Sequence, residues 1–223
     1  RQEYACIEPA EKREYYALSP AQERLYVLQH MSVNNINYNL PYLIPLFDNF
    51  EKEKLESVFK KLIERHESLR TSFITVNEEP VQKIHREVNF SIGCYEIAEE
   101  SGAAEILSRF TRPFDLSKAP LLRVNYVAFG SNRRVLFIDM HHIITDGTSQ
   151  EILEKEFTAL YSGEELPPLK LQYKDYALWQ NSGARDALIK KQEGYWLNMF
   201  ADEIPLLTLP TDYPRPMVQS FEG

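Results

Sequence analysis

The sequence has few cysteines and no long apolar run. Its only two cysteines, Cys6 and Cys94, lie far apart without a pairing pattern, whereas small secreted domains depend on several conserved disulfides. No apolar stretch approaches the roughly 20 residues that cross a bilayer. Residues 1–4 lack the basic-then-apolar order of a signal peptide. We therefore expect a cytoplasmic protein that does not contact a membrane.

The sequence also lacks an excess of positive charge. Its 25 Lys and Arg residues stand against 33 Asp and Glu residues, a formal net charge of -8. A nucleic-acid-binding domain normally presents a basic surface to the phosphate backbone, and no cluster of Lys and Arg offsets the overall sign here. We therefore expect no nucleic-acid partner.

Several sequence patterns of catalytic sites are absent. There is no glycine-rich phosphate loop, no serine in a nucleophile elbow, and no Cys/His spacing typical of metal ligands. These absences argue against phosphoryl transfer, triad hydrolysis and zinc chemistry. We expect no metal site.

Hydrophobic residues make up 43% of the 223 positions, enough for a substantial core. Apolar residues at three- and four-residue spacing predict helices over residues 51–66 and 150–161. A helix is also expected over residues 20–28, where Ser19 and Gln22 can form a capping box and Pro20 suits the first helical position. Further helices are expected over residues 103–110 and 173–200, the last with a break near residue 183. Ser19 and Ser149 are the expected N-caps of the helices at 20–28 and 150–161.

Strand-like segments are interspersed with these helices. They cover residues 40–47, 69–76, 81–86, 89–95, 121–129 and 134–140. Pro41 and Pro45 favour an edge position for the first strand, and the last is apolar on both faces, as a strand in the middle of a sheet would be. We predict an α/β fold, a mixed β-sheet with flanking helices.

The segment 135–147 carries the strongest indication of chemistry. An apolar run stops on His141 and His142 and turns at Asp146 and Gly147. Histidine can accept and return a proton near neutral pH. Alternation along a strand places the two rings on opposite faces, so at most one serves a given cavity. A structural, hydrogen-bonded histidine is the ordinary alternative for a His-His pair alone.

Charged residues elsewhere supply candidate partners for this segment. Asp146 could orient an imidazole, pair with an arginine, or make a local turn hydrogen bond. Arg65 and Arg70 lie at a helix-to-strand junction, where an inward-pointing arginine needs a carboxylate. We predict that Arg70 pairs with Asp146 and that both arginines support the site.

Residues 141–147, HHIITDG, resemble the HHxxxDG signature of the condensation domains of nonribosomal peptide synthetases, which belong to the chloramphenicol-acetyltransferase-like superfamily. Four further segments resemble motifs of this family in the expected order: 19–26 (SPAQERLY), 65–73 (RHESLRTSF), 112–116 with 120–123 (RPFDL and PLLR), and 173–180 (YKDYALWQ).

The resemblance implies one lobe of a two-lobed fold with a tunnel between the lobes. Residues 16–200 would be the N-terminal lobe and 201–223 the start of the connection to the C-terminal lobe. Residues 1–15 are charged and lack a core periodicity, as an inter-domain linker would. Motifs of the second lobe are missing from the sequence. We therefore expect this fragment to fold but not to catalyse condensation alone, and to expose an apolar surface where the second lobe would pack.

The resemblance also implies a reaction. An acceptor aminoacyl thioester would attack a donor peptidyl or aminoacyl thioester and form an amide, as in antibiotic biosynthesis. His142 would be the active-site group beside His141, with Asp146 mainly structural and the Gly147 amide a candidate donor to the oxyanion. Whether His142 takes the amine proton or only positions the amine stays open.

No cofactor would be bound by this lobe, because both substrates arrive on the phosphopantetheine arms of upstream and downstream peptidyl carrier domains. The missing C-terminal lobe and an adenylation domain in the same polypeptide are the other implied partners. Three alternatives stay open: an epimerization domain of the same superfamily, a non-catalytic module that docks carrier domains, and a free-standing acyltransferase that uses a CoA thioester.

Overall fold

The computed structural model describes residues 7–46, 51–97, 102–130, 133–202, 204, 207–214 and 217. Its residues fall into two compact units, Arg1–Gln180 and Asn181–Gly223. Each unit is considered by itself. In the described part, none of the helices combines the length and apolar character needed to cross a bilayer.

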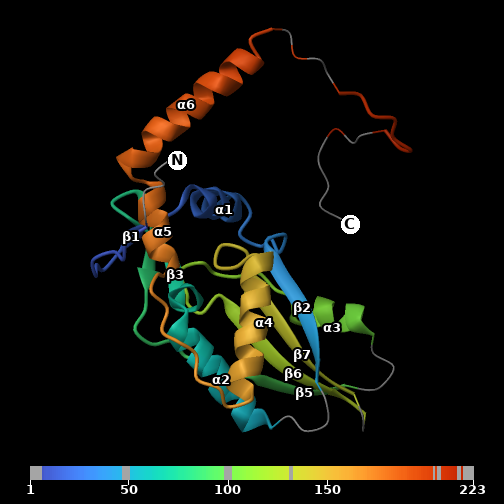
Figure 1. Cartoon of the computed structure of the whole chain (residues 1–223). Coiled ribbons are helices and arrows are strands. Elements are labelled where there is room, and N and C mark those ends of the chain that lie inside the picture. Colours follow the sequence, from blue (N-terminus) through green and yellow to red (C-terminus); the bar gives the residue numbers. More distant parts are fainter. Residues whose placement is uncertain are drawn as a thin grey trace. The chain divides into compact units, whose positions relative to one another are not determined.

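The described residues of the first unit form two sheets (Figure 1). The smaller has the strand order β1-β4-β3 and the larger the order β2-β7-β6-β5; only the β5 and β6 pair is parallel. The strands are β1 (Tyr16–Ala17), β2 (Asn39–Leu46), β3 (Thr71–Val76), β4 (Glu79–Ile84), β5 (Gly93–Ile97), β6 (Leu122–Phe129) and β7 (Arg133–His141).

Helices connect these strands. They are α1 (Pro20–Met31), α2 (Lys52–Arg65), a short 3-10 helix η1 (Glu67–Arg70), α3 (Ala103–Phe110), α4 (Gly147–Tyr161) and α5 (Tyr173–Gln180). Ser19 caps α1 through the expected capping box with Gln22. The apolar stripe of α2 forms because its buried residues recur every three or four positions.

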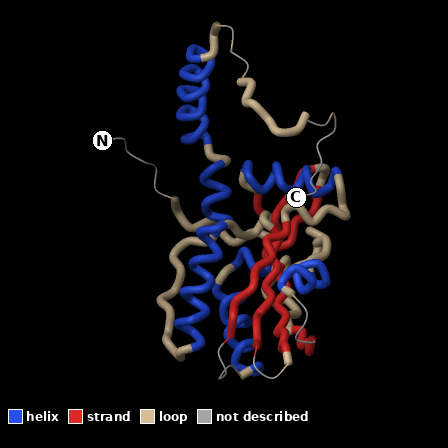
Figure 2. The backbone as a smooth tube through the Cα atoms, turned by 90° about the vertical axis from the view of Figure 1, so that its right-hand side faces the viewer, coloured by secondary structure: helices blue, strands red, loops and turns tan. Residues whose placement is uncertain are grey.

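Helices cover both faces of the larger sheet (Figure 2). Leu136, Ile138 and Met140 of β7 belong to the main core with α2 and α4. Val135 and Phe137 face the other way, into a smaller cluster with α3. Residues of one strand face share a period of two, so Asp139 and His141 lie on the face of Val135 and Phe137.

The fold class predicted from the sequence is confirmed. The strand at 40–47 is indeed an edge strand, β2, and the strand at 134–140 is the interior strand β7; Phe47 lies outside the described residues. Two bounds differ. The strand expected from residue 69 starts at Thr71 after η1, and the strand expected from residue 89 starts only at Gly93.

The second unit contains α6 (Gly183–Met199), which follows the expected break near Gly183. Residues 207–214 form neither helix nor strand, as their prolines predict. Several large apolar side chains of this unit are more than half exposed: Tyr195, Trp196, Leu197, Met199 and Phe200.

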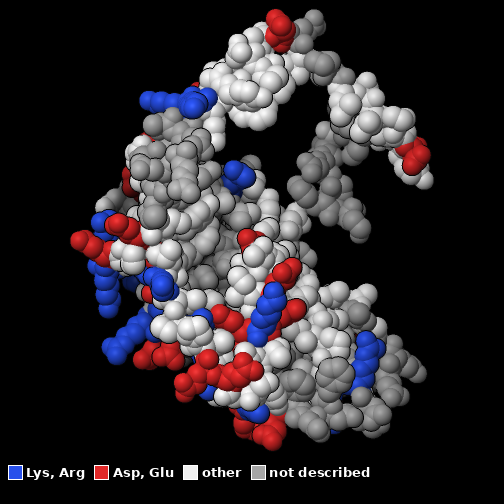
Figure 3. Space-filling view, viewed as in Figure 1, with Lys and Arg blue, Asp and Glu red and all other residues white. Residues whose placement is uncertain are grey.

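Charge is unevenly distributed over the first unit. Figure 3 shows acidic side chains gathered over the end of this unit where α2 and α4 lie. Of the two cysteines, Cys94 is a free thiol, and Cys6 lies outside the described residues.

Candidate active site

His141 ends β7 as a fully buried ring. Its Nδ1 accepts a hydrogen bond from the backbone N–H of Ile143 at 3.1 Å, so its Nε2 carries the proton and donates to Oε1 of Gln29 at 3.3 Å. Burial, and then the neighbouring charge of His142, lower the pKa of His141 to about 4. The ring is neutral near pH 7 and has no exposed surface, so it is out of reach of a substrate.

His142, the next residue, is exposed. Its backbone N–H donates to the carbonyl oxygen of Tyr38 at 2.7 Å, and its ring Nδ1 lies 2.7 Å from the carbonyl oxygen of Thr145. A carbonyl oxygen only accepts hydrogen bonds, so Nδ1 carries a hydrogen. In the neutral ring the lone pair is therefore on Nε2. The expected division between a buried and a reachable histidine is present.

Asp146 is the N-cap of α4. Its Oδ1 accepts hydrogen bonds from the backbone N–H of Ser149 at 2.8 Å and from the Ser149 hydroxyl at 2.7 Å. These bonds, the hydroxyl first, hold the pKa of Asp146 below its usual value, with a smaller contribution from the charge of His142. The prediction that Ser149 caps this helix is wrong, because Asp146 occupies the cap position and Ser149 lies within the first turn.

The predicted pairing of Arg70 with Asp146 is also wrong. Arg70 donates to the carbonyl oxygen of His85 at 2.7 Å and lies 3.6 Å from Oε1 of Glu67, three residues before it. The short helix η1 directs Arg70 toward β4, where a neighbouring carboxylate and a strand-end carbonyl satisfy it. Asp146 makes instead the local turn hydrogen bond, one of the three alternatives open to it.

Gly147 is the first residue of α4. A Cβ built on it meets no heavy atom within 4 Å outside its own chain neighbours. Packing inside this chain therefore does not require a glycine at this position. The space beside its backbone is open, as close approach of a ligand would need.

Arg65 supports α4 from α2. Its Nε lies 3.0 Å from Oε2 of Glu156, and Nε2 of His66 lies 2.6 Å from the same oxygen. Partial burial alone would raise the pKa of Glu156, but Arg65 and His66 outweigh it and keep that pKa below its usual value. The expected supporting role of Arg65 thus has a definite partner, on the helix that Asp146 caps.

A buried ion pair lies on the same strand face as His141. Nη1 of Arg123 is 3.1 Å from Oδ2 of Asp139, and Nδ2 of Asn39 donates to both oxygens of that carboxylate at 3.1 and 2.9 Å. Burial raises the pKa of Asp139 to about 6, although Asn39 and Arg123 oppose the shift. The sequence analysis missed these residues. An acid two positions before His141 in an otherwise apolar strand was the available signal.

The same arginine holds the loop before β6. Arg123 donates to the carbonyl oxygens of Arg112 and Pro113 at 2.6 and 2.7 Å, and its guanidinium lies 3.6 Å from the ring centroid of Phe114. Phe114 in turn meets the ring of His141 edge to face, at 6.1 Å between centroids. Segment 112–116 therefore packs against the buried histidine.

Other motif segments meet away from the histidines. The hydroxyls of Ser19 and Tyr173 lie 2.9 Å apart. Glu67 forms an ion pair with Lys174. The buried carboxylate of Asp175 accepts from the backbone N–H groups of Ala10 and Gln172 at 2.9 and 2.7 Å. These contacts join residues distant in sequence around the N-terminus of α5.

The cavity that one of the two histidines is expected to serve is not found at His142 in either of two sizeable hollows of the described part of the chain. A hollow of about 490 Å³ is lined in part by Gln29 and Phe114, which contact the buried His141. A larger hollow, of about 980 Å³, lies beside α2 and β4. His142 lines neither of them. Among the described residues, no group of three or more His, Cys, Asp or Glu side chains could hold a metal ion.

Comparison with known proteins gives the family of this chain. The family model of the condensation domain matches residues 12–223. Gramicidin S synthase 2 of Aneurinibacillus migulanus is 50% identical over 222 residues, which are 100% of this chain and 5% of that protein. Surfactin synthase subunit 1 of Bacillus subtilis (strain 168) is 48% identical over 222 residues, 99% of this chain and 6% of that protein. The chain thus spans a small fraction of the length of these relatives.

Solved structures share the fold. The X-domain in its complex with OxyB from teicoplanin biosynthesis superposes with a TM-score of 0.82 at 27% identity, over 95% of this chain and 49% of the other. The starter condensation domain of the rhizomide synthetase RzmA matches in fold, with a TM-score of 0.69 at 20% identity, over 85% and 48%. The architecture is that of the chloramphenicol-acetyltransferase-like fold, and the chain belongs to the condensation domain family of nonribosomal peptide synthetases.

Proposed function

We propose that this chain carries the acyl-transfer residues of a condensation domain, with His142 at the reacting amine. One observation supports this most directly: the ring of His142 is exposed, and its Nδ1 is tied to the carbonyl oxygen of Thr145. This bond fixes the ring plane and leaves Nε2 as the proton acceptor. A positioned imidazole of this kind contributes roughly 10²- to 10⁴-fold as a general base.

In the proposed step the acceptor amine attacks the carbonyl carbon of the donor thioester. The nitrogen–carbon bond forms, the carbon–sulfur bond breaks, and the amine proton passes by way of Nε2 of His142 to the departing thiolate. The alternative role of His142, orientation of the amine without proton transfer, uses the same geometry. Holding two tethered reactants in line supplies ~7–11 kcal/mol of the barrier in favourable cases.

The other predicted site residues act through structure in this proposal. His141 anchors the end of β7, and Asp146 begins α4. The Gly147 backbone N–H belongs to the first turn of α4, where amides have no partner within the helix, and it would donate to the developing oxyanion. Arg65 steadies α4 through Glu156. Arg70 supports η1 and β4 rather than Asp146.

A second lobe completes the site. We infer that residues 16–200 form the N-terminal lobe, that 1–15 are linker and that 201–223 begin the connection to the other lobe. The matched X-domain chain is about twice as long as the matched region, which covers 49% of it. The exposed aromatic side chains of the second unit fit the expected apolar surface. The opposite wall of the tunnel would come from that lobe, so this fragment alone would be inactive.

The proposal includes carrier partners. Donor and acceptor substrates would arrive on phosphopantetheine arms of upstream and downstream peptidyl carrier domains, and an adenylation domain of the same polypeptide would load the acceptor. No cofactor would be bound by this lobe. The cytoplasmic location expected from the sequence stays a prediction.

The test uses the parent synthetase module with loaded carrier domains and mass spectrometry of the carrier-bound product. A new amide that depends on His142, and falls at least about 10²-fold in His142→Ala, supports the proposal. Glu151→Gln, an exposed position on α4, is the control and should retain full activity. An inverted stereocentre without a new amide would show the epimerization alternative instead.

A docking role is the second candidate, because the X-domain was solved in a complex with another protein, OxyB. The two functions respond differently to one variant. His142→Ala would leave carrier binding unchanged in either case, but it would leave the module's product yield unchanged only if the domain serves docking alone.

A further inference from the structure

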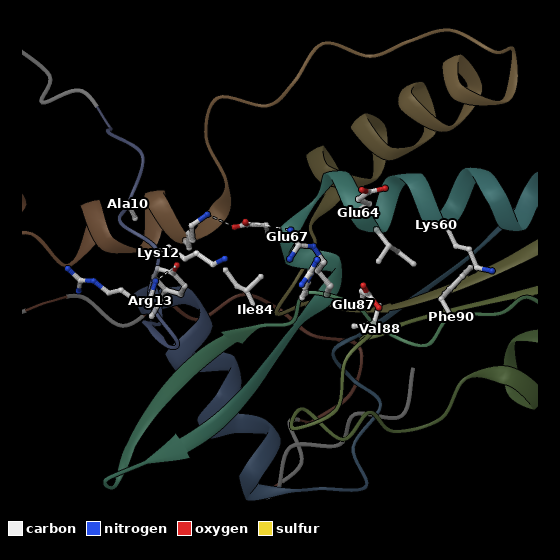
Figure 4. A pocket seen from close by; sticks show the side chains of 15 residues that line it. Ala10, Lys12, Arg13, Lys60, Glu64, Glu67, Ile84, Glu87, Val88 and Phe90 are labelled. Carbon is white, nitrogen blue, oxygen red and sulfur yellow. Dashed lines mark hydrogen bonds and ion pairs between the residues drawn. The ribbon is translucent and has the colours of Figure 1, made fainter.

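The hollow of about 980 Å³ in the first unit contains none of the proposed active-site histidines (Figure 4). It lies between the N-terminal segment 10–16, α2, and the strand end and loop 84–90. Lys12 and Arg13 come from the first of these elements, Lys60 from the second and Arg86 from the third. Segments far apart in sequence therefore surround one concave surface.

The lining is basic, although the chain is acidic overall. Six cationic and three anionic side chains line the hollow, an excess of three positive charges in a chain whose formal net charge is -8. A basic concave surface on an acidic protein concentrates field lines and attracts anionic partners. The positive charge of this surface is therefore opposite to the net charge of the chain.

The deeper charges of the hollow are already paired. Glu67 binds Lys174 and lies 3.6 Å from Arg70, and the side chains of both cations are less than one-fifth exposed. The more exposed cations differ from one another. Lys60 pairs with Glu56 at 2.6 Å, whereas Lys12 and Arg86 are exposed and form no ion pair with a carboxylate of the described residues.

Apolar side chains lie beside these charges. Val88 and Phe90 are partly buried against the main core, and Ile84 lies at the end of β4. Figure 4 shows Val88 and Phe90 near Lys60 and Glu64 of α2. The hollow thus offers apolar contact together with unpaired positive charge.

These features favour a peptide over a small ligand. Small-molecule sites bury most of the ligand and fix it with a few convergent polar groups. Here the least exposed charged groups of the hollow, Glu67, Lys174 and Arg70, pair with one another. In the described part, the buried side-chain atoms without a hydrogen-bond partner belong to Asn39, Thr111 and Thr145, and none of these residues lines the hollow. Exposed cations spread over several elements suit an extended anionic segment.

We propose that this hollow is a docking site for an acidic peptide segment of a protein partner, with Glu or Asp side chains at the Lys12 and Arg86 rim and bulky apolar side chains against Val88 and Phe90. The site shares no residue with the His142 site. Peptide binding therefore does not depend on whether His142 takes part in acyl transfer.

The test is fluorescence anisotropy on the whole chain with a short labelled peptide of glutamate and leucine. Binding should weaken as ionic strength rises from about 0.01 to 0.15 M, where the Debye length falls from ~30 to ~8 Å. The double variant Lys12→Glu/Arg86→Glu should bind about tenfold more weakly. The matched control Arg24→Glu/Lys155→Glu makes the same charge change at exposed positions of α1 and α4 and should bind within twofold of wild type.

Further binding measurements, with a changed peptide and with variants of the chain, identify the ligand class. Replacing every leucine of the peptide by serine should weaken binding, and Val88→Ser should do the same; thermal melts confirm that the variants are folded. His142→Ala should bind normally. Equal loss in the control double variant, or binding of inorganic tripolyphosphate as tight as that of the peptide, would overturn the proposal.

Discussion

The guanidinium of Arg123 and the carboxylate of Asp139 form a buried ion pair at 3.1 Å. Asp139 lies two residues before His141, the buried histidine that ends β7. The Asp139 side chain is completely buried and that of Arg123 is 18% exposed. The pair also fixes the loop whose Phe114 meets His141. This relationship supports the end of β7, from which His142 emerges.

Arg123→Met should destabilise the chain strongly. Removing one partner of a buried ion pair leaves an uncompensated charge and costs about 3–5 kcal/mol. Lys118→Met is the matched control, because the Lys118–Asp115 pair is exposed, at 80% and 52%, and such pairs contribute less than ~1 kcal/mol. Urea unfolding measures both changes. Equal losses in the two variants would contradict the assigned importance of the buried pair.

His141 and Asp139 should oppose each other when the pH falls. The folded pKa of His141, about 4, lies below its ordinary 6.5, so its stabilising contribution is present above pH 6.5 and is lost as the pH falls through 4. The folded pKa of Asp139, about 6, lies above its ordinary 3.8. Its contribution is present below pH 3.8 and is lost as the pH rises through 6.

Asp139→Asn removes one of these opposing effects. Between about pH 6 and pH 4 the variant should lose roughly 1–3 kcal/mol more stability than wild type loses over the same interval. The measurement is the free energy of unfolding in urea at several pH values for both proteins. Parallel curves would show that Asp139 does not titrate in this window.

Asp146 and Arg70 should act independently. Asp146→Ala removes the N-cap of α4 and should cost about 1 kcal/mol, whereas Asp146→Asn keeps an accepting oxygen and should cost less. Because Arg70 bonds to His85 and Glu67, the double variant Asp146→Ala/Arg70→Met should equal the sum of the single variants within ~0.5 kcal/mol. A larger coupling energy, measured by chemical denaturation, would restore the pairing that the structure rejects.

Gly147→Ala should separate stability from activity. The added Cβ meets no neighbouring atom within 4 Å, so the thermal midpoint of the chain should stay the same or rise slightly. In the parent module the methyl group would enter the open space beside the proposed oxyanion donor and slow amide formation about 10- to 100-fold. Unchanged turnover of the folded variant would argue that no reacting group approaches this backbone.

Local patterns determined much of this protein in advance. Apolar spacing located α2 and α4 to within a few residues, and prolines placed β2 at an edge. Alternation predicted that His141 and His142 face opposite sides, and the structure has one buried and one exposed. These inferences succeed because the periods of helix and strand, and the limits that proline sets, depend on neighbours along the chain.

Partner choice was decided only in three dimensions. Arg70 pairs with the nearby carboxylate of Glu67, and Asp146 accepts hydrogen bonds from Ser149. Asp139 pairs with Arg123 and accepts from Asn39, which is 100 positions away in the sequence. The parallel pairing of β5 with β6 and the basic hollow likewise join distant segments. The sequence by itself determined the periods of the helices and strands and the number of charges. Only the packed chain decided which side chains meet, because those contacts depend on distances in space that no local period contains.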